Sequence, residues 1–167
     1  MGAGPSRRRS STLLRVVLGL FAVAALFTPV VARAEMASVK VAEANFRAGP
    51  STDERVRFIG LRYFPVKVLK REGTWTYVRD FEGEKAWIAS RLLSNQLTVI
   101  SKAKRGNVRA EPTSKSEIVY RMSRGWAFRV LERKKSWIRI GDESSPIGWV
   151  HQKLVWGLEK KKPNEKK

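Results

Sequence analysis

The hexapeptide NFRAGP at residues 45–50 returns as NVRAEP at residues 107–112, an offset of 62 (107 − 45). The same offset aligns the chain with itself without a gap, and 12 of the 48 positions that follow from Asn45 are identical, where average residue usage would give roughly three. The identities include two tryptophans in each copy, Trp75 and Trp87 in the first, and Trp137 and Trp149 in the second. Self-similarity at one fixed period is typical of tandem modules, so one small domain is expected twice.

Inside each copy, apolar and polar residues alternate with the period of a β-strand, as they do along residues 64–69 and 126–131. No segment after residue 35 keeps a helical period. Turn-forming residues separate the apolar runs at 49–53, 71–73 and 80–83 in the first copy and at 111–114, 134–135 and 141–146 in the second. Several short strands with frequent turns predict an all-β chain of two small antiparallel barrels.

The first 34 residues lie outside the repeat and have the pattern of a secretory signal peptide. An arginine-rich leader precedes an apolar run, Val16–Phe27, and Ala32-Arg33-Ala34 has the small-x-small form of a cleavage site. We predict cleavage between Ala34 and Glu35; an uncleaved anchor is the alternative. The apolar run is shorter than the roughly 20 residues of a spanning helix, so no transmembrane helix is expected in the mature chain.

These boundaries divide the chain into a signal peptide (1–34), a first module (35–94), a second module (95–157) and a basic, disordered tail (158–167). The net charge of +19 is uneven: the first module carries +3 and the second +8. An excess of this size predicts either an anionic partner docking on the second module or a solvated surface that keeps the protein soluble. With the predicted signal peptide, it places the protein outside the cytoplasm, in the periplasm or at the cell envelope.

The sequence offers little for catalysis. It contains no cysteine and a single histidine, His151, whereas metal sites and general bases need several convergent groups. We therefore interpret His151 as a surface or interface residue. Asp80 and Asp142 recur in the repeat, but they fall in turns, where an aspartate caps its own backbone. No catalytic residue, metal site or cofactor is predicted, and the protein is not expected to be an enzyme.

Several motifs, in the same order in both copies, resemble the bacterial SH3-like (SH3b) domains. The first is the Asn-x-Arg-x-x-Pro-Ser/Thr segment, at Asn45–Ser51 and Asn107–Thr113. A Val-rich strand follows, and then a Trp-x-x-Val/Ile strand at Trp75–Val78 and Trp137–Ile140. An acidic turn leads to a Gly/Ala-Trp-Val/Ile strand with a leucine four or five residues later, at Ala86–Leu92 and Gly148–Leu154. The resemblance covers nearly all of residues 37–157. It implies a five-stranded SH3-like barrel in each copy.

The resemblance also implies an exported, non-catalytic binding module of the cell envelope, often associated with cell-wall peptides or with targeting of partner proteins. It places Trp75 and Trp137 at the ligand-contacting tryptophan of SH3 folds. This chain departs from the peptide-binding eukaryotic SH3 domains, because leucines, Leu92 and Leu154, stand where those domains have a late tyrosine. Recognition of polyproline by stacked aromatics is therefore not expected.

A hairpin of the second module provides a candidate binding face. If residues 126–140 pair symmetrically about Lys134, Val130 faces Ile138 and Phe128 faces Ile140 on the core side, while Leu131 faces Trp137 and Arg129 faces Arg139 outside. Facing arginines repel, so either another group offsets this repulsion or the face holds an anion, with Arg133, Lys134 and Lys135 at the tip. The candidate binding residues of the second module are thus Trp137, Arg129, Arg139, Arg133, Lys134 and Lys135, against Trp75 and Tyr77 in the first.

The expected partner is an anionic envelope component: a carboxylate-bearing peptidoglycan peptide, an anionic lipid headgroup or an acidic envelope protein. Arginine suits carboxylate and phosphate through its bidentate fork. The alternative for Trp75 and Trp137 is a purely structural role, each covering its hairpin. The alternative function is a nucleic-acid-binding small barrel, since a pI near 11 also suits that role, but a cleaved signal peptide would keep the protein from genomic DNA and ribosomes.

Overall fold

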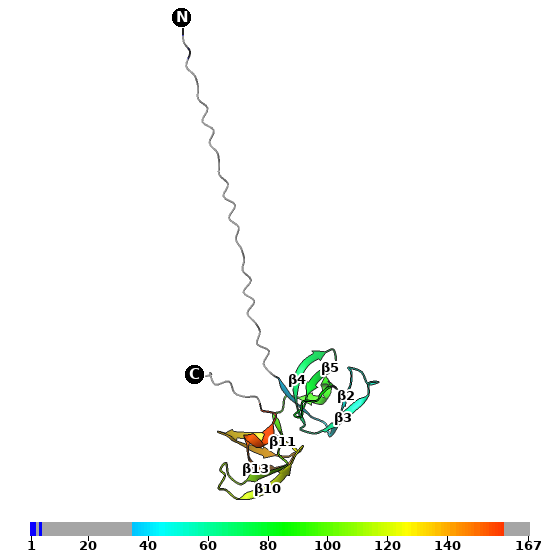
Figure 1. Ribbon diagram of the computed structural model, residues 1–167, viewed down its shortest axis with the longest axis vertical. Helices are drawn as coiled ribbons and strands as arrows, with labels where there is room; N and C mark the ends of the chain where they lie inside the picture. Colours follow the sequence, from blue (N-terminus) through cyan, green and yellow to red (C-terminus); the bar gives the residue numbers. More distant parts are fainter. Residues whose placement is uncertain (3, 5–34, 159–167) are drawn as a thin grey trace. The chain divides into compact units, whose positions relative to one another are not determined.

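A computed structural model describes residues 1, 2, 4 and 35–158 of the chain (Figure 1). The predicted signal peptide and basic tail lie almost entirely outside the described residues. The described part is all-β: two antiparallel sheets of seven strands each, with two 3-10 turns as its only helical elements. The expected fold class, two tandem SH3-like modules, is confirmed. No helix among the described residues is both long and apolar enough to span a bilayer.

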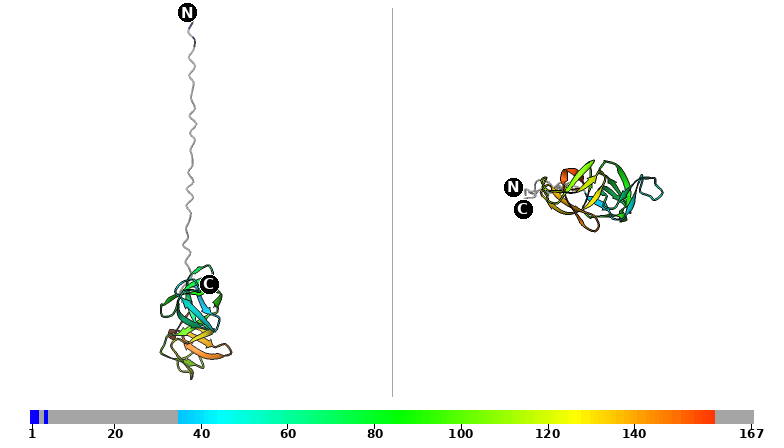
Figure 2. Two further views of the ribbon diagram at one scale, coloured as in Figure 1. Left: turned by 90° about the vertical axis from the view of Figure 1, so that its right-hand side faces the viewer. Right: turned by 90° about the horizontal axis from the view of Figure 1, so that it is seen from below.

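The first sheet has the strand order β3-β2-β6-β5-β4-β1-β7, with antiparallel neighbours throughout. It is strongly bent, as the views in Figures 1 and 2 show. Its elements are β1 (Met36–Val39), β2 (Glu43–Arg47), β3 (Val56–Leu61), β4 (Pro65–Glu72), β5 (Trp75–Arg79), β6 (Lys85–Ala89), the 3-10 turn η1 (Ser90–Leu92) and β7 (Leu93–Ser94).

The second sheet repeats this topology in the order β10-β9-β13-β12-β11-β8-β14. Seven strands are two more than the resemblance implied, and the last strand of each sheet has only two residues. The elements are β8 (Thr98–Ser101), β9 (Arg105–Arg109), β10 (Ile118–Ser123), β11 (Ala127–Lys134), β12 (Trp137–Gly141), β13 (Pro146–His151), the 3-10 turn η2 (Gln152–Leu154) and β14 (Val155–Trp156).

Each module has its own apolar core, built from the inward residues of alternating strands. Trp87 and Trp149 are buried, with 8% and 9% of their surface exposed. Trp75 and Trp137, in contrast, are only half-buried.

The two cores fill one equivalent space differently. In the first module Ala44 of β2 pairs with Gly60 of β3, and a Cβ at Gly60 would lie 2.4 Å from Cε2 of the buried Phe46. In the second module Met122 stands at the position of Gly60 and Val108 at that of Phe46, and both are fully buried. The first module thus fills this space with a phenylalanine ring beside a glycine, and the second fills it with a methionine beside a valine.

The repeated Asn-x-Arg segment holds the first loop of each module. The guanidinium of Arg47 donates to the carbonyl oxygen of Glu54 (2.7 Å), and its equivalent Arg109 donates to that of Ser116. A backbone hydrogen bond closes each loop at its base, from Ala48 in the first module and Ala110 in the second. The arginine of the motif is therefore an intramodule clamp, and it fixes the loop that borders the site described below.

Two turns of each module contain a residue with positive φ, and the two copies differ in where they place glycine. The turn before β4 has Tyr63 (φ 68°) in the first module and Gly125 (φ 84°) in the second. The turn after β4 has Gly73 (φ 53°), whereas its equivalent after β11 has Lys135 (φ 54°). Left-handed backbone is unfavourable for any residue with a Cβ, so Tyr63 and Lys135 each hold a strained conformation.

The acidic turns confirm that their aspartates cap the backbone. Asp80 Oδ1 accepts hydrogen bonds from the amides of Glu82 and Glu84 (2.9 and 2.8 Å). Asp142 Oδ1 accepts from the amides of Ser144 and Ser145 and from the Ser144 hydroxyl. These hydrogen bonds, those from the two amides above all, lower the pKa of Asp142, because they stabilise its ionised form.

Candidate functional site

The hairpin of β11 and β12 does not have the predicted register. Lys134 pairs with Trp137, Arg133 with Ile138 and Glu132 with Arg139. The pairing expected from symmetry about Lys134 is wrong, including that of Val130 with Ile138, Phe128 with Ile140 and Leu131 with Trp137.

Two features account for the difference. The loop is the two-residue turn Lys135–Ser136, so the turn lies further along the chain than expected. The register then shifts between Val130 and Glu132, which leaves Leu131 as the extra residue of a β-bulge. The first module has the same bulge between Val68 and Lys70. The same face of the hairpin is buried despite the shift in register, because Phe128, Ile138 and Ile140 are all in the core.

Arg129 and Arg139 consequently do not face each other. Arg129 pairs with Gly141, and its guanidinium donates to the backbone carbonyls of Asp142 (2.6 Å) and Glu143 (3.4 Å). Arg139 pairs with Glu132, and their charged groups are 3.9 Å apart. The repulsion on which the anion-binding argument relied is absent, and Arg129 instead ties its strand to the acidic turn.

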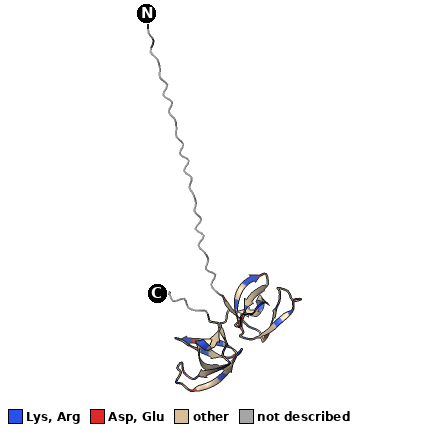
Figure 3. Cartoon of the chain, in the orientation of Figure 1, with Lys and Arg blue, Asp and Glu red and all other residues tan. Residues whose placement is uncertain are grey.

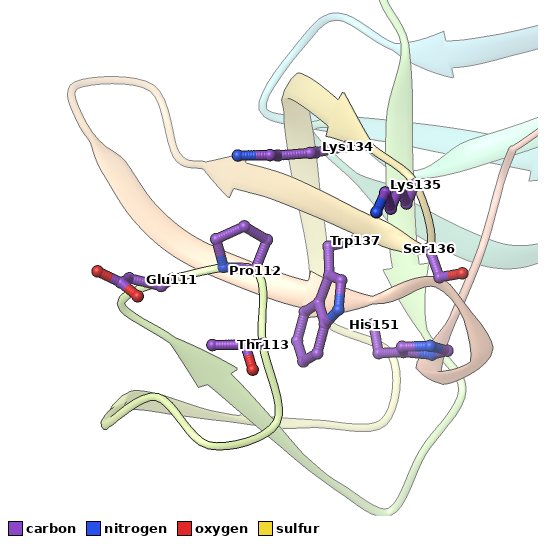
Figure 4. A pocket seen from close by; sticks show the side chains of 8 residues that line it. All are labelled: Glu111, Pro112, Thr113, Lys134, Lys135, Ser136, Trp137 and His151. Carbon is purple, nitrogen blue, oxygen red and sulfur yellow. The ribbon is translucent and has the colours of Figure 1, made fainter.

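A pocket of about 690 Å³ lies beside Trp137 (Figure 4). On one side are residues of the hairpin tip, and on the other are residues of the first loop of the module. The lining residues are Glu111, Pro112, Thr113, Lys134, Lys135, Ser136, Trp137 and His151. Three of them, Trp137, Lys134 and Lys135, are among the predicted binding residues; Arg129, Arg133 and Arg139 do not line the pocket.

Trp137 and His151 form the floor between these two sides. The rings meet edge to face, with centroids 5.3 Å apart and planes at 87°. His151 Nδ1 accepts a hydrogen bond from the amide of Lys153 (3.2 Å). Both side chains are half-buried, so each presents part of its ring to the pocket. Among the described residues, no cluster of His, Cys, Asp or Glu could hold a metal ion.

The pocket is electropositive at the hairpin tip. Arg133, Lys134 and Lys135 are consecutive and exposed, and no ion pair in the described part of the chain involves them. Figure 3 marks the positions of lysine and arginine along the strands of both modules. At the equivalent tip of the first module the charges are paired, Arg71 with Glu35 (2.5 Å) and Lys70 with Glu72 (2.9 Å).

The first module has a smaller pocket, of about 310 Å³, beside the equivalent tryptophan, Trp75. It lies toward β2 and η1 rather than toward the hairpin tip. Tyr77, the other predicted residue of this module, does not line it; its ring packs on Trp87 with centroids 5.0 Å apart. Trp75 is thus the only one of these two predicted residues beside a pocket.

The loop residues Glu111, Pro112 and Thr113, together with Ser136 and His151, were not predicted as site residues. The first three belong to the repeated Asn-x-Arg-x-x-Pro segment, which indicated a module boundary but not a site. Their position beside Trp137 is a consequence of folding, because β9 and β12 both neighbour β13 in the sheet. His151 follows from the same arrangement, since it pairs with Trp137 across β12 and β13.

Comparison with known proteins gives one relative and several distant structures. Over 140 residues the chain is 25% identical to YrvJ of Bacillus subtilis (strain 168), which carries the name of an N-acetylmuramoyl-L-alanine amidase; the match covers 77% of this chain and 27% of that protein. The chain thus spans about a quarter of the length of this relative.

Two solved structures are distantly similar. An NlpC/P60 family protein from Bacillus cereus ATCC 10987 is 14% identical, with 72% of this chain and 55% of that chain covered and a TM-score of 0.35. The CBD of endolysin LysPBC5 is 16% identical, with 73% and 92% covered and a TM-score of 0.28.

A family model matches each module separately. The model described as bacterial SH3 domain matches residues 40–95 and again residues 102–157, which together are more than half of the chain. The two matches fall on the two sheets. The chain therefore belongs to the bacterial SH3 domain family and holds two of these domains in tandem.

Proposed function

We propose that this protein is a non-catalytic binding protein of the bacterial cell envelope, and that its second module holds a carboxylate-bearing peptide of the cell wall in the Trp137 pocket. Family membership supports a binding module. The named activity of the Bacillus relative concerns N-acetylmuramoyl-L-alanine, a unit of peptidoglycan, and this supports the cell wall as the binding partner. The predicted signal peptide, residues 1–34, would carry the protein to that compartment.

The observation that carries the proposal is the combination of a half-buried indole with two adjacent lysines that have no ion pair among the described residues. Trp137 offers an apolar face for the body of a peptide residue. Lys134 and Lys135 offer ammonium groups to its carboxylate, and such charge-assisted hydrogen bonds are stronger than neutral ones. Pro112, opposite the hairpin tip, supplies a second apolar wall.

Arg129 and Arg139 have a smaller part in this proposal than the sequence suggested. Arg129 donates to two backbone carbonyls, and neither arginine lines the pocket. Their direct participation stays a prediction, which Arg129→Ala with Arg139→Ala tests. We expect this pair of substitutions to weaken wall binding less than the loss of Lys134 and Lys135 does.

The decisive test measures retention of the full-length protein on purified peptidoglycan over a range of salt concentrations. We expect Lys134→Gln with Lys135→Gln to weaken retention about tenfold at low salt, which corresponds to roughly 1.4 kcal/mol for the two charges together. The matched control is Lys104→Gln with Lys115→Gln, which removes the same charge from exposed positions of the same module outside the pocket. Equal losses in the two double variants would refute the pocket and leave only a general charge effect.

The N-terminus of the protein isolated from cells tests the compartment separately. A chain that begins at Glu35 in the envelope fraction agrees with export. An intact N-terminus in the cytosol would refute the proposed location, and the nucleic-acid-binding alternative would then have to be tested by the salt dependence of DNA binding.

A further inference from the structure

The Trp75 pocket of the first module contains both signs of charge. Its polar and aromatic lining consists of Glu43 and Asn45 from β2, Arg47, Thr52, Trp75 and Arg91. At about 310 Å³, it is at the lower end of the range for small-ligand sites. The pocket therefore has room for a small group, and its walls come from the strands β2, β5 and β6, a loop and the 3-10 turn η1.

The oppositely charged residues Glu43 and Arg91 of this pocket do not pair with each other. Glu43 and Arg91 line the same pocket, yet no ion pair within 4.0 Å joins them, and neither takes part in any ion pair of the described residues. Arg47, in contrast, is engaged by the carbonyl of Glu54. A carboxylate and a guanidinium held apart in one pocket can each bind the opposite charge of a single ligand.

The equivalent positions of the second module are all cationic. Glu43, Arg47 and Arg91 correspond to Arg105, Arg109 and Lys153 at the 62-residue offset. At the hairpin tip, Glu72 is likewise replaced by Lys134.

Both acidic residues around Trp75 have thus become basic around Trp137. Over these four positions the first module carries no net charge and the second carries +4; Glu111, which lines the Trp137 pocket where the first module has Gly49, lowers the excess of the second module to +3. Two modules that share a fold but differ in charge in this way select different ligands, because a charged side chain repels a ligand group of the same sign.

We propose that the Trp75 pocket is a second binding site, specific for a zwitterion, that is, a whole amino acid or very short peptide with a free ammonium and a free carboxylate. Glu43 binds the ammonium group and Arg91 the carboxylate, while the indole of Trp75 covers the apolar part between them. The site goes beyond the proposed function of the second module. It makes the tandem chain a binder of two different chemical groups rather than of one group twice.

The test uses three matched probes with the full chain: alanyl-alanine, its N-acetylated form, which is an anion, and its C-terminal amide, which is a cation. The indole N–H signals of Trp75 and Trp137 in a proton–nitrogen NMR spectrum report the two modules separately, after assignment with Trp75→Phe and Trp137→Phe. We expect alanyl-alanine to shift the Trp75 signal with at least fivefold tighter binding than either capped form.

Two substitutions assign the roles. Glu43→Gln is expected to weaken alanyl-alanine at Trp75 about fivefold while leaving the binding of the N-acetylated form there unchanged. Arg91→Gln is expected to weaken alanyl-alanine at Trp75 about fivefold while leaving the binding of the C-terminal amide there unchanged. Gln96→Glu, an exposed change outside the pocket, is the control and should leave all three affinities at Trp75 within twofold.

Equal binding of the three probes at Trp75, no binding of any of them, or no effect of Glu43→Gln would each overturn the proposal. The Trp137 signal in the same spectra tests the proposed function independently. A response of Trp137 to the N-acetylated anion with no selectivity at Trp75 refutes only the zwitterionic site, and the reverse pattern refutes only the anionic one.

Discussion

Exchanging the core residues of one module for those of the other tests whether the repeat has conserved a space rather than particular side chains. Phe46 is fully buried and its ring stacks on Phe58, with centroids 4.5 Å apart. Phe46→Val removes four carbon atoms, and at about 0.8 kcal/mol for each buried carbon the free energy of unfolding should fall by roughly 3 kcal/mol.

Gly60→Met alone should also destabilise the first module, because even a Cβ at this position would lie 2.4 Å from the Phe46 ring. Overpacking of this kind typically costs about 1–3 kcal/mol. All proteins of this cycle carry Ala44→Gly, because the equivalent residue of the second module is Gly106 and a Cβ there would lie 2.5 Å from Cε of Met122. On that background the double variant, Phe46→Val with Gly60→Met, reproduces the pair Val108 and Met122 of the second module. In it the methionine fills the space left by the ring, so the double variant should be more stable than Phe46→Val by about 1–2 kcal/mol.

Urea denaturation followed by tryptophan fluorescence measures all four proteins of this cycle, and circular dichroism shows whether each remains a β-sheet protein at zero urea. A coupling free energy near zero, with the double variant destabilised by the sum of the two single changes, would refute the idea that the two residues share one space. A cavity control is Val78→Ala in the same core, which removes buried carbon at a position that is not part of the exchange, so its coupling free energy with Gly60→Met should be near zero.

Two further predictions concern the turns of the second module. Lys135→Gly should raise the free energy of unfolding by about 1 kcal/mol, because it relieves the left-handed residue, while lowering retention on peptidoglycan; denaturation and retention measured on one preparation check both, and a loss of stability would contradict the assigned strain. The pKa of Asp142 lies below the ordinary aspartate value of about 3.9, so the stabilisation from its turn is present at neutral pH and is lost only as the pH falls through that lowered pKa. NMR titration of its carboxyl carbon should therefore give a midpoint below about 3.9, and an unshifted midpoint in the folded protein would show that the hydrogen bonds from Ser144 and Ser145 do not form.

The repeat made much of the fold predictable from sequence. Apolar alternation identified the buried strand faces, and the aspartates at the turns cap the backbone as expected. These features depend on local periodicity and turn chemistry, which neighbouring residues determine.

The site was predicted less well, because it depends on register. A β-bulge at Leu131 has no residue-type signature, since leucine fits either face of a strand, and a shift of one residue changes every pairing beyond it. Arg129 and Arg139 do not face each other because the turn at Lys135–Ser136 places Glu132 opposite Arg139, and the bulge then places Gly141 opposite Arg129. Lys134 and Lys135 were predicted as site residues and do line the pocket, because a hairpin tip is exposed in either register. Glu111 and Pro112 reach the pocket only through the three-dimensional path of the first loop.

The distribution of glycine between the two turns has a consequence for recombination between the halves of the gene. A module that runs from Thr98 to Phe128 and continues at Lys67 would have glycine at both left-handed positions, Gly125 and Gly73. The reciprocal product would have Tyr63 and Lys135 there, and at about 1–2 kcal/mol for each left-handed residue with a Cβ it would be less stable by roughly 2–4 kcal/mol. Crossing-over within this duplicated sequence therefore yields one relaxed and one strained hybrid domain, and the strained hybrid is the one that retains Lys134 and Lys135 of the Trp137 pocket.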